Sequence, residues 1–202
     1  LSIDPAFVVQ QMRVVLDDIG ADCLKTGMLH SPEIIAAVAD TILAAAPAVP
    51  LVVDPVMVAK GGARLLEASA HEALVRRLLP LASVLTPNAP EAGALTGIAV
   101  TDAASQQAAG AALVAAGARA VRVKGGHIAG GRMVDLLVTA EGAERFEGPR
   151  IETAHTHGTG CTLASAIAAG LAQGMDLRDA VARARAYALA AIKAAPGYGH
   201  GH

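Results

Sequence analysis

The chain carries a Gly-Thr-Gly stretch, His155-Thr156-His157-Gly158-Thr159-Gly160-Cys161-Thr162, that runs directly into an Ala-rich segment at residues 163–170. Glycines let a backbone approach a ligand closely, and an Ala-rich segment is typical of a helix. The first amides of a helix have no acceptor within it, and the helix dipole adds positive potential, so such a place favours an anion. We therefore predict phosphate chemistry at a helix start, with Cys161 in the first turn.

Two commoner glycine motifs do not match this stretch. A dinucleotide fingerprint needs a strand before its glycines and a further Gly or Ala after two spacers, where this chain has Leu163. A P-loop needs Gly, four residues and then Gly-Lys-Ser/Thr, and the chain contains no such run. An ordinary glycine-led helix start with Cys161 as a small buried side chain remains the alternative interpretation.

Composition narrows the class of protein. A chain of 202 residues is most simply one domain, 1–202, large enough to bury a core. A net charge of -2 and 2% aromatic residues give no reason to expect nucleic acid. No apolar run reaches the roughly 18 residues of a membrane-spanning helix. Two cysteines and no signal-peptide pattern favour a reducing, cytoplasmic location.

Helical and strand-like segments alternate along the chain, which predicts an α/β fold with a mostly parallel sheet covered on both faces. A hairpin over 134–139 and 144–148 is the exception to this alternation. Helices are expected over 5–19, 31–46, 69–79, 90–95, 102–116, 161–173 and 177–194, and strands over 22–28, 50–55, 84–86 and 120–124.

Polar residues fall where the predicted strands end. Asp54, Asn88, Glu91 and Lys124 all lie at or just beyond the carboxyl end of a strand. In open α/β sheets this edge is where ligands bind. Two acids, an amide, a lysine and an anion-binding helix start together predict a site for a magnesium nucleotide.

Four motifs follow one another in the sequence: Asp54-Pro55-Val56-Met57-Val58-Ala59-Lys60, Thr86-Pro87-Asn88 with Glu91, Val123-Lys124-Gly125-Gly126-His127, and His157-Gly158-Thr159-Gly160-Cys161-Thr162. Together they resemble the motifs of the hydroxymethylpyrimidine/phosphomethylpyrimidine kinases of thiamine biosynthesis, in the ribokinase-like superfamily. The terminal Gly199-His200-Gly201-His202 also resembles a stretch near the C-terminus of that family. The resemblance covers essentially the whole chain and implies a three-layer α/β/α fold.

The resemblance implies ATP- and Mg²⁺-dependent phosphorylation of 4-amino-5-hydroxymethyl-2-methylpyrimidine and then of its monophosphate. Cys161 matches the position where other ribokinase-like enzymes carry an Asp general base, and the sign of its net pKa shift does not follow from sequence. The implied roles are an anion hole at Gly158, Thr159, Gly160 and Cys161; magnesium binding by Asp54 and Glu91 with Asn88; and nucleotide contacts from Lys124, Asn88, Thr86, Gly126 and His127.

The substrate pocket is less well defined by the resemblance. Gly27 and Met28 lie in a segment that borders the pyrimidine in the family, although plain packing at a strand end explains Met28 equally well. Val56 lines either the pocket or the core. Lys60 reaches phosphates or is simply solvated. Asp135 follows the family's Val-Asp step, and a solvated strand acid is an equally good interpretation.

Family members carry a longer N-terminal portion, which holds the first strand, a Gly-Ser-Asp loop and a polar residue for the pyrimidine. We expect these N-terminal strands to be absent, with an exposed sheet edge and weak activity if the chain really starts at Leu1. A pyridoxal kinase and a non-catalytic nucleotide-binding fragment are the competing interpretations. The family resemblance also implies a homodimer.

Overall fold

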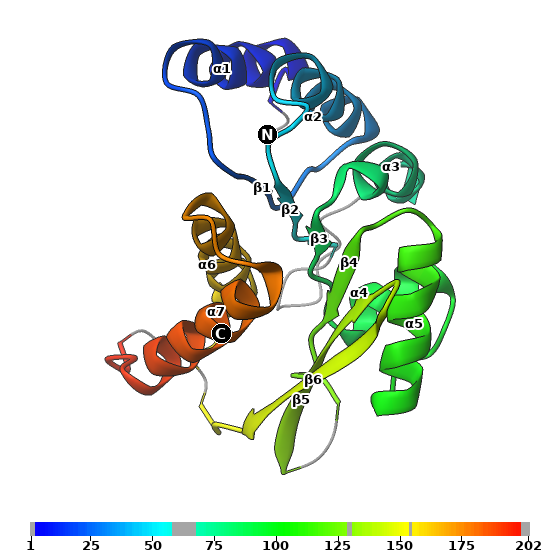
Figure 1. Ribbon diagram of the computed structural model, residues 1–202, viewed down its shortest axis with the longest axis vertical. Helices are drawn as coiled ribbons and strands as arrows, with labels where there is room; N and C mark the ends of the chain where they lie inside the picture. Colours follow the sequence, from blue (N-terminus) through cyan, green and yellow to red (C-terminus); the bar gives the residue numbers. More distant parts are fainter. Residues whose placement is uncertain (1–2, 58–67, 129–130, 154, 199–202) are drawn as a thin grey trace.

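The computed structural model describes residues 3–57, 68–128, 131–153 and 155–198. Within them, six strands form a single sheet in the order β1-β2-β3-β4-β5-β6 (Figure 1). Strands β1 to β4 pair in parallel, and β5 and β6 add an antiparallel hairpin. The strands are β1 Leu24–Thr26, β2 Leu51–Val53, β3 Val84–Leu85, β4 Ala120–Val123, β5 Arg132–Thr139 and β6 Gly142–Pro149.

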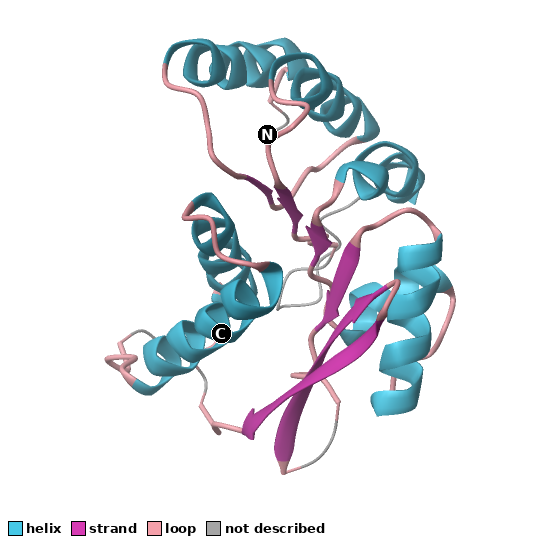
Figure 2. Ribbon diagram, in the orientation of Figure 1, coloured by secondary structure: helices cyan, strands magenta, loops and turns pink. Residues whose placement is uncertain are grey.

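Helices cover both faces of the sheet (Figure 2). One layer contains α2 to α5, and α6 with α7 forms the other. The predicted α/β architecture with a mostly parallel sheet is therefore confirmed. The helices are α1 Pro5–Asp18, α2 Pro32–Ala45, α3 Ala68–Ala73, α4 Ala89–Thr96, α5 Ala103–Ala115, α6 Thr159–Ala172 and α7 Leu177–Lys193.

Alternation along each strand divides the core into two clusters. Val53 and Val121 point into the cluster under α2 and α5, whereas Val52 and Val84 point into the cluster under α6 and α7. Successive residues of a strand face opposite sides, so strands buried on both faces are apolar throughout. The same parity decides on which face the polar residues at the strand ends lie.

The helix starts follow the capping signals of the sequence. The Asp4 side chain accepts a hydrogen bond from the Ala6 amide, and Ser31 accepts one from Ile34. In both helices a proline occupies the first turn, where its missing N–H costs no helical hydrogen bond.

The expected continuous helix over 69–79 is only partly correct. The α-helix α3 gives way to a π-helical turn, Leu74–Leu78, and then to a 3₁₀ turn, Leu79–Leu81. Pro80 explains the change, because it lacks the N–H that an α-helix would use and its ring crowds the preceding turn.

Lys60 and the Gly-His tail at 199–202 lie outside the described residues, so the predictions made for them are untested. Among the residues that are described, no helix has both the length and the apolar character needed to cross a membrane.

Candidate active site

Three polar side chains meet at the carboxyl ends of neighbouring strands. Asp54 follows β2, Thr86 follows β3 and Lys124 follows β4. Lys124 Nζ lies 3.0 Å from Asp54 Oδ1, and Thr86 Oγ1 donates to the same oxygen at 3.1 Å. Asp54 is only 2% exposed, so these two donors replace the water that burial removes from its carboxylate. By strand parity all three lie on the sheet face that α6 and α7 cover.

A capping box at the start of α4 brings a second carboxylate to this cluster. Asn88 Oδ1 accepts from the Glu91 amide at 2.8 Å, and Glu91 Oε2 accepts from the Asn88 amide at 2.7 Å. The same Glu91 oxygen lies 3.9 Å from Lys124 Nζ. Burial raises the pKa of Glu91, and the positive charge of Lys124 offsets only part of that effect. The side-chain oxygen of Asn88 is therefore used as the N-terminal cap of α4.

The Gly-Thr-Gly stretch begins α6 beside this cluster. Gly158 precedes the helix with φ +74°, a left-handed conformation that favours glycine, and no side chain caps the helix there. A Cβ on Gly160 would lie 3.2 Å from Lys124 Nζ. The ammonium group therefore lies directly against the first turn of α6, whose leading amides have no acceptor within the helix.

Cys161 is exposed in that first turn. Desolvation, followed by the negative charge of Asp54, raises the pKa of its thiol, and the nearby cations Lys25 and Lys124 lower it by less. The structure thus gives the sign that the sequence left open. The thiol also lines an open groove of about 640 Å³ between α6 and α7, together with Ser165 and Tyr187. Cys161 is therefore not a buried core side chain.

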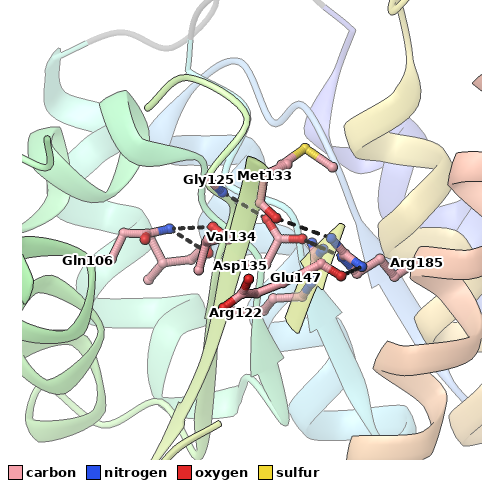
Figure 3. Close-up of polar contacts among 9 residues, drawn as sticks. Gln106, Arg122, Gly125, Met133, Val134, Asp135, Glu147 and Arg185 are labelled. Carbon is pink, nitrogen blue, oxygen red and sulfur yellow. Dashed lines mark hydrogen bonds and ion pairs between the residues drawn. The ribbon is translucent and has the colours of Figure 1, made fainter. Parts of the chain in front are cut away.

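The glycines after Lys124 are fixed by other parts of the chain. The Gly125 amide donates to Asp135 Oδ1 at 2.8 Å (Figure 3). Arg150 Nη1 donates to the Gly126 carbonyl at 2.9 Å. Desolvation and the charges of Lys124 and Arg150 lower the pKa of His127, which keeps its imidazole neutral near pH 7. Asp135 itself is 2% exposed, so the interpretation as a solvated strand acid is wrong.

The expected substrate residues follow the ends of β1 and β2. Gly27 and Met28 come directly after β1, and Met28 is 54% exposed. Val56 is half-buried, and its amide donates to the Asp54 carbonyl at 2.8 Å. Lys25 was missed as a site residue, although its register partner Val52 faces α6 and the same parity could have identified it.

The chain is similar to known proteins over nearly its whole length. The sequence profile of the phosphomethylpyrimidine kinase family matches residues 1–202. The chain belongs to this family. A thiamine biosynthesis bifunctional protein of Geobacter sulfurreducens is 50% identical over 200 residues, which span 99% of this chain and 41% of that relative. The hydroxymethylpyrimidine/phosphomethylpyrimidine kinase of Streptomyces coelicolor is 48% identical over 184 residues, 91% of this chain and 67% of the relative.

Solved structures confirm the ribokinase-like fold. The phosphomethylpyrimidine kinase of Clostridium difficile superposes with a TM-score of 0.82 at 35% identity, over 95% of this chain and 78% of its own. An ADP complex of Bacillus subtilis pyridoxal kinase gives a TM-score of 0.89 at 37% identity, over 96% of this chain and 73% of its own. The chain therefore spans between two fifths and four fifths of the relatives compared with it.

Proposed function

We propose that the protein transfers a phosphoryl group from ATP to the hydroxymethyl group of 4-amino-5-hydroxymethyl-2-methylpyrimidine, and then to the resulting monophosphate. One observation supports this most strongly: an exposed thiol, Cys161, lies in the uncapped first turn of α6, beside the Lys124–Asp54 pair. Family membership supports the same reaction.

The start of α6 supplies the groups that phosphoryl transfer needs. Charge spreads over three oxygens of the migrating group, and preorganised donors stabilise it. The amides of Gly158, Thr159, Gly160 and Cys161 are the proposed donors. Gly160 keeps the approach open, because a Cβ there would press on Lys124 Nζ at 3.2 Å. Lys124 would act as a point charge on the nucleotide phosphates, with Thr86, Asn88, Gly126 and His127 around it.

The donor set also fits magnesium. Asp54 and Glu91 both lie within 4 Å of Lys124 Nζ. In the described part of the chain, no group of three or more His, Cys, Asp or Glu side chains is arranged to hold a metal ion by itself. Mg²⁺ prefers oxygen ligands and usually binds through one or two carboxylates, waters and substrate phosphates. Bound there, it would neutralise charge on the phosphates.

Cys161 is the proposed acceptor of the substrate hydroxyl proton. Only the thiolate can take that proton, and the raised pKa means that little thiolate exists at neutral pH without substrates. The cations Lys25 and Lys124 and the dipole of α6 favour the thiolate. Gly27, Met28 and Val56 are the proposed wall for the pyrimidine ring, within three residues of the ends of β1 and β2.

Pyridoxal is the second candidate substrate, since a pyridoxal kinase superposes on this chain with a TM-score of 0.89. The test is to measure phosphorylation of the hydroxymethylpyrimidine, its monophosphate and pyridoxal by the purified protein with ATP. We expect the pyrimidine to have the higher kcat/KM. A higher value for pyridoxal would replace the first candidate, and ADP binding without any turnover would favour a non-catalytic nucleotide-binding protein.

Magnesium titration tests the metal ligands separately. We expect Asp54→Asn and Glu91→Gln to raise the Mg²⁺ concentration needed for half-maximal rate by about tenfold or more. Unchanged titrations would remove these residues from the site. The protein is further proposed to act as one domain over 1–202 and to form a homodimer, which light scattering of the purified protein would test.

A further inference from the structure

A second charged cluster lies beneath the proposed site, between the sheet and α7. Asp135 of β5 accepts hydrogen bonds from Arg122 Nη2 of β4 at 2.6 Å and from Arg185 Nε of α7 at 3.1 Å, both at Oδ2 (Figure 3). Asp135 and Arg122 are each 2% exposed. The two guanidinium groups supply the hydrogen bonds and the opposite charge that a carboxylate this deeply buried needs.

The other oxygen of Asp135 holds the backbone just after Lys124. Asp135 Oδ1 accepts from the Gly125 amide at 2.8 Å. A Cβ on Gly125 would come within 1.8 Å of the Val134 carbonyl oxygen, so only glycine lets β4 leave the sheet so close to β5. Gln106 Nε2 donates to the Val123 and Val134 carbonyls, which satisfies the acceptors where the two strands separate.

Lys124 is thus fixed from both sides. Its own amide donates to the Pro87 carbonyl at 2.8 Å, and the next amide along the chain donates to Asp135. Arg185 also donates to the Glu147 and Met133 carbonyls, so these hydrogen bonds attach α7 to the β5–β6 hairpin that carries Asp135. Because α7 packs along α6, the cluster connects the helix that carries Cys161 with β4, the strand that Lys124 follows.

We propose that Asp135 is a positioning residue for phosphoryl transfer: through the Gly125 amide and Arg185 it fixes Lys124 and the 125–127 turn against the start of α6. This inference rests on the proposed function. If Asp135 had a purely structural role, its replacement would lower the stability of the fold and weaken the binding of nucleotide and of pyrimidine equally. If Asp135 positions Lys124 through Gly125, its replacement should weaken nucleotide binding more than pyrimidine binding, since Lys124 and the 125–127 turn form the proposed nucleotide site.

Two double variants isolate the Gly125 hydrogen bond. Asp135→Leu/Arg122→Met removes the buried Asp135–Arg122 pair and the acceptor together, and replacement of a buried ion pair by apolar side chains is often tolerated. Arg185 keeps the Glu147 and Met133 carbonyls as acceptors in both variants. Asp135→Asn/Arg122→Met removes the same charges but keeps an oxygen that can accept from Gly125. We expect the Leu variant to raise the ATP KM and the ADP Kd by about tenfold or more, with the pyrimidine KM within about twofold of wild type. The Asn variant should bring the ATP KM and the ADP Kd back toward their wild-type values.

Arg178→Gln is the matched control. Arg178 of α7 pairs with Glu144 of β6, so it also joins α7 to the hairpin, but at the surface and away from Gly125. Its ATP KM should equal that of the wild type. Equal impairment of both double variants, or a folded Leu variant with wild-type ADP Kd, would overturn the proposal. If that variant does not fold, Arg185→Gln decides, because a folded protein with unchanged ATP KM would equally refute it.

The readouts separate this inference from the proposed function. Absence of pyrimidine phosphorylation by the wild type would refute the function. ADP binding by calorimetry, compared between wild type and variants, would still decide whether Asp135 positions the nucleotide side.

Discussion

Cys161 combines exposure with an unfavourable electrostatic setting for its thiolate. The thiol lies at the open edge of the α6–α7 groove, yet desolvation and the Asp54 carboxylate raise its pKa. A proton acceptor with these properties gains activity as pH rises, since the thiolate fraction increases about tenfold per pH unit below the pKa. The charges around the thiol therefore set its reactivity, and single substitutions can change it in either direction.

Alkylation should report that pKa directly. The rate of Cys161 modification by iodoacetamide should rise with pH through pH 9 and show no plateau below it, because the pKa is raised above the ordinary value of 9.0. Asp54→Asn should speed the reaction at pH 7.5, and Lys25→Met should slow it, since the first removes an anion and the second a cation. Mass spectrometry of the modified peptide, with Cys161→Ser as control, measures the rates. A plateau below pH 9 would contradict the assigned direction.

Removal of the thiol should affect chemistry and leave nucleotide binding intact. Cys161→Ala is expected to lower kcat by about 10²- to 10⁴-fold, the usual contribution of a positioned base, with ADP Kd within about twofold. Stopped assays for kcat and calorimetry for Kd measure the two effects. Turnover at the wild-type rate would exclude Cys161 as the proton acceptor.

Strand ends were sufficient to predict that Asp54 and Lys124 meet at the site, but they did not identify Lys25. Asp54, Thr86 and Lys124 directly follow buried strands, so their meeting at one edge follows from a parallel sheet alone. The burial of Asp135 could not be predicted in this way. Its partner Arg185 lies 50 residues further along the chain, and without that cation an acid in a hairpin strand is more simply interpreted as solvated.

At the scale of elements, the two glycines at the start of α6 are needed for different reasons. Gly158 needs its left-handed φ of +74° to begin α6, and nothing lies within 4 Å of the place where its Cβ would be. At Gly160 the constraint is Lys124 instead. The two glycines should therefore respond to alanine in different ways.

Gly158→Ala should lower the free energy of unfolding by about 1 kcal/mol, the cost of a left-handed conformation in a residue with a Cβ. Gly174→Ala, at φ +78° beyond the other end of α6, should cost a similar amount without affecting the ATP KM. Gly160→Ala should raise the ATP KM with little loss of stability, because it displaces Lys124 Nζ. Urea unfolding and steady-state kinetics test the three, and an equal effect of Gly158→Ala and Gly160→Ala on both quantities would refute the distinction.

Glu91 gives α4 a pH-dependent stability. Its pKa is raised in the folded protein, so it favours folding when protonated, and that contribution fades as pH rises from 4.5 through the raised value. The unfolding free energy of the wild type minus that of Glu91→Gln should therefore fall between pH 4 and pH 7. Glu141→Gln is the control of opposite sign, because the Thr139 hydroxyl lowers the pKa of that exposed acid. A difference that grows with pH at Glu91 would contradict the assignment.

Capping signals indicate where several helices start, because they depend on neighbouring residues only. Asp4, Ser31 and Asp102 each accept hydrogen bonds from the turn that follows them. The segment after α3 was harder to predict, because apolar spacing continues through Pro80 and only the backbone reveals the change to π and 3₁₀ turns. Periodicity thus identified the helix but not its hydrogen-bond pattern.

At the scale of the whole molecule, the packing is uneven. Helix α2 buries six side chains, whereas α1, which lies against α2, has no fully buried residue (Figure 1). Phe7, Val14 and Ile19 at α1 are 54%, 63% and 81% exposed. Local opening costs least where few apolar contacts are lost, so α1 should open more readily than α2.

Hydrogen exchange should reflect this difference in burial between α1 and α2. Backbone amides of α1 are expected to exchange at least about tenfold faster than those of α2, since opening α1 exposes far less buried surface. The two helices have the same length, 14 residues, and both begin with a capped proline turn, which makes α2 a matched reference. Exchange measured by mass spectrometry on the purified protein tests this, with peptides from each helix compared at one pH. Equal protection of the two would mean that a further contact stabilises α1, and its exposed Val14 and Ile19 would then lie in that contact.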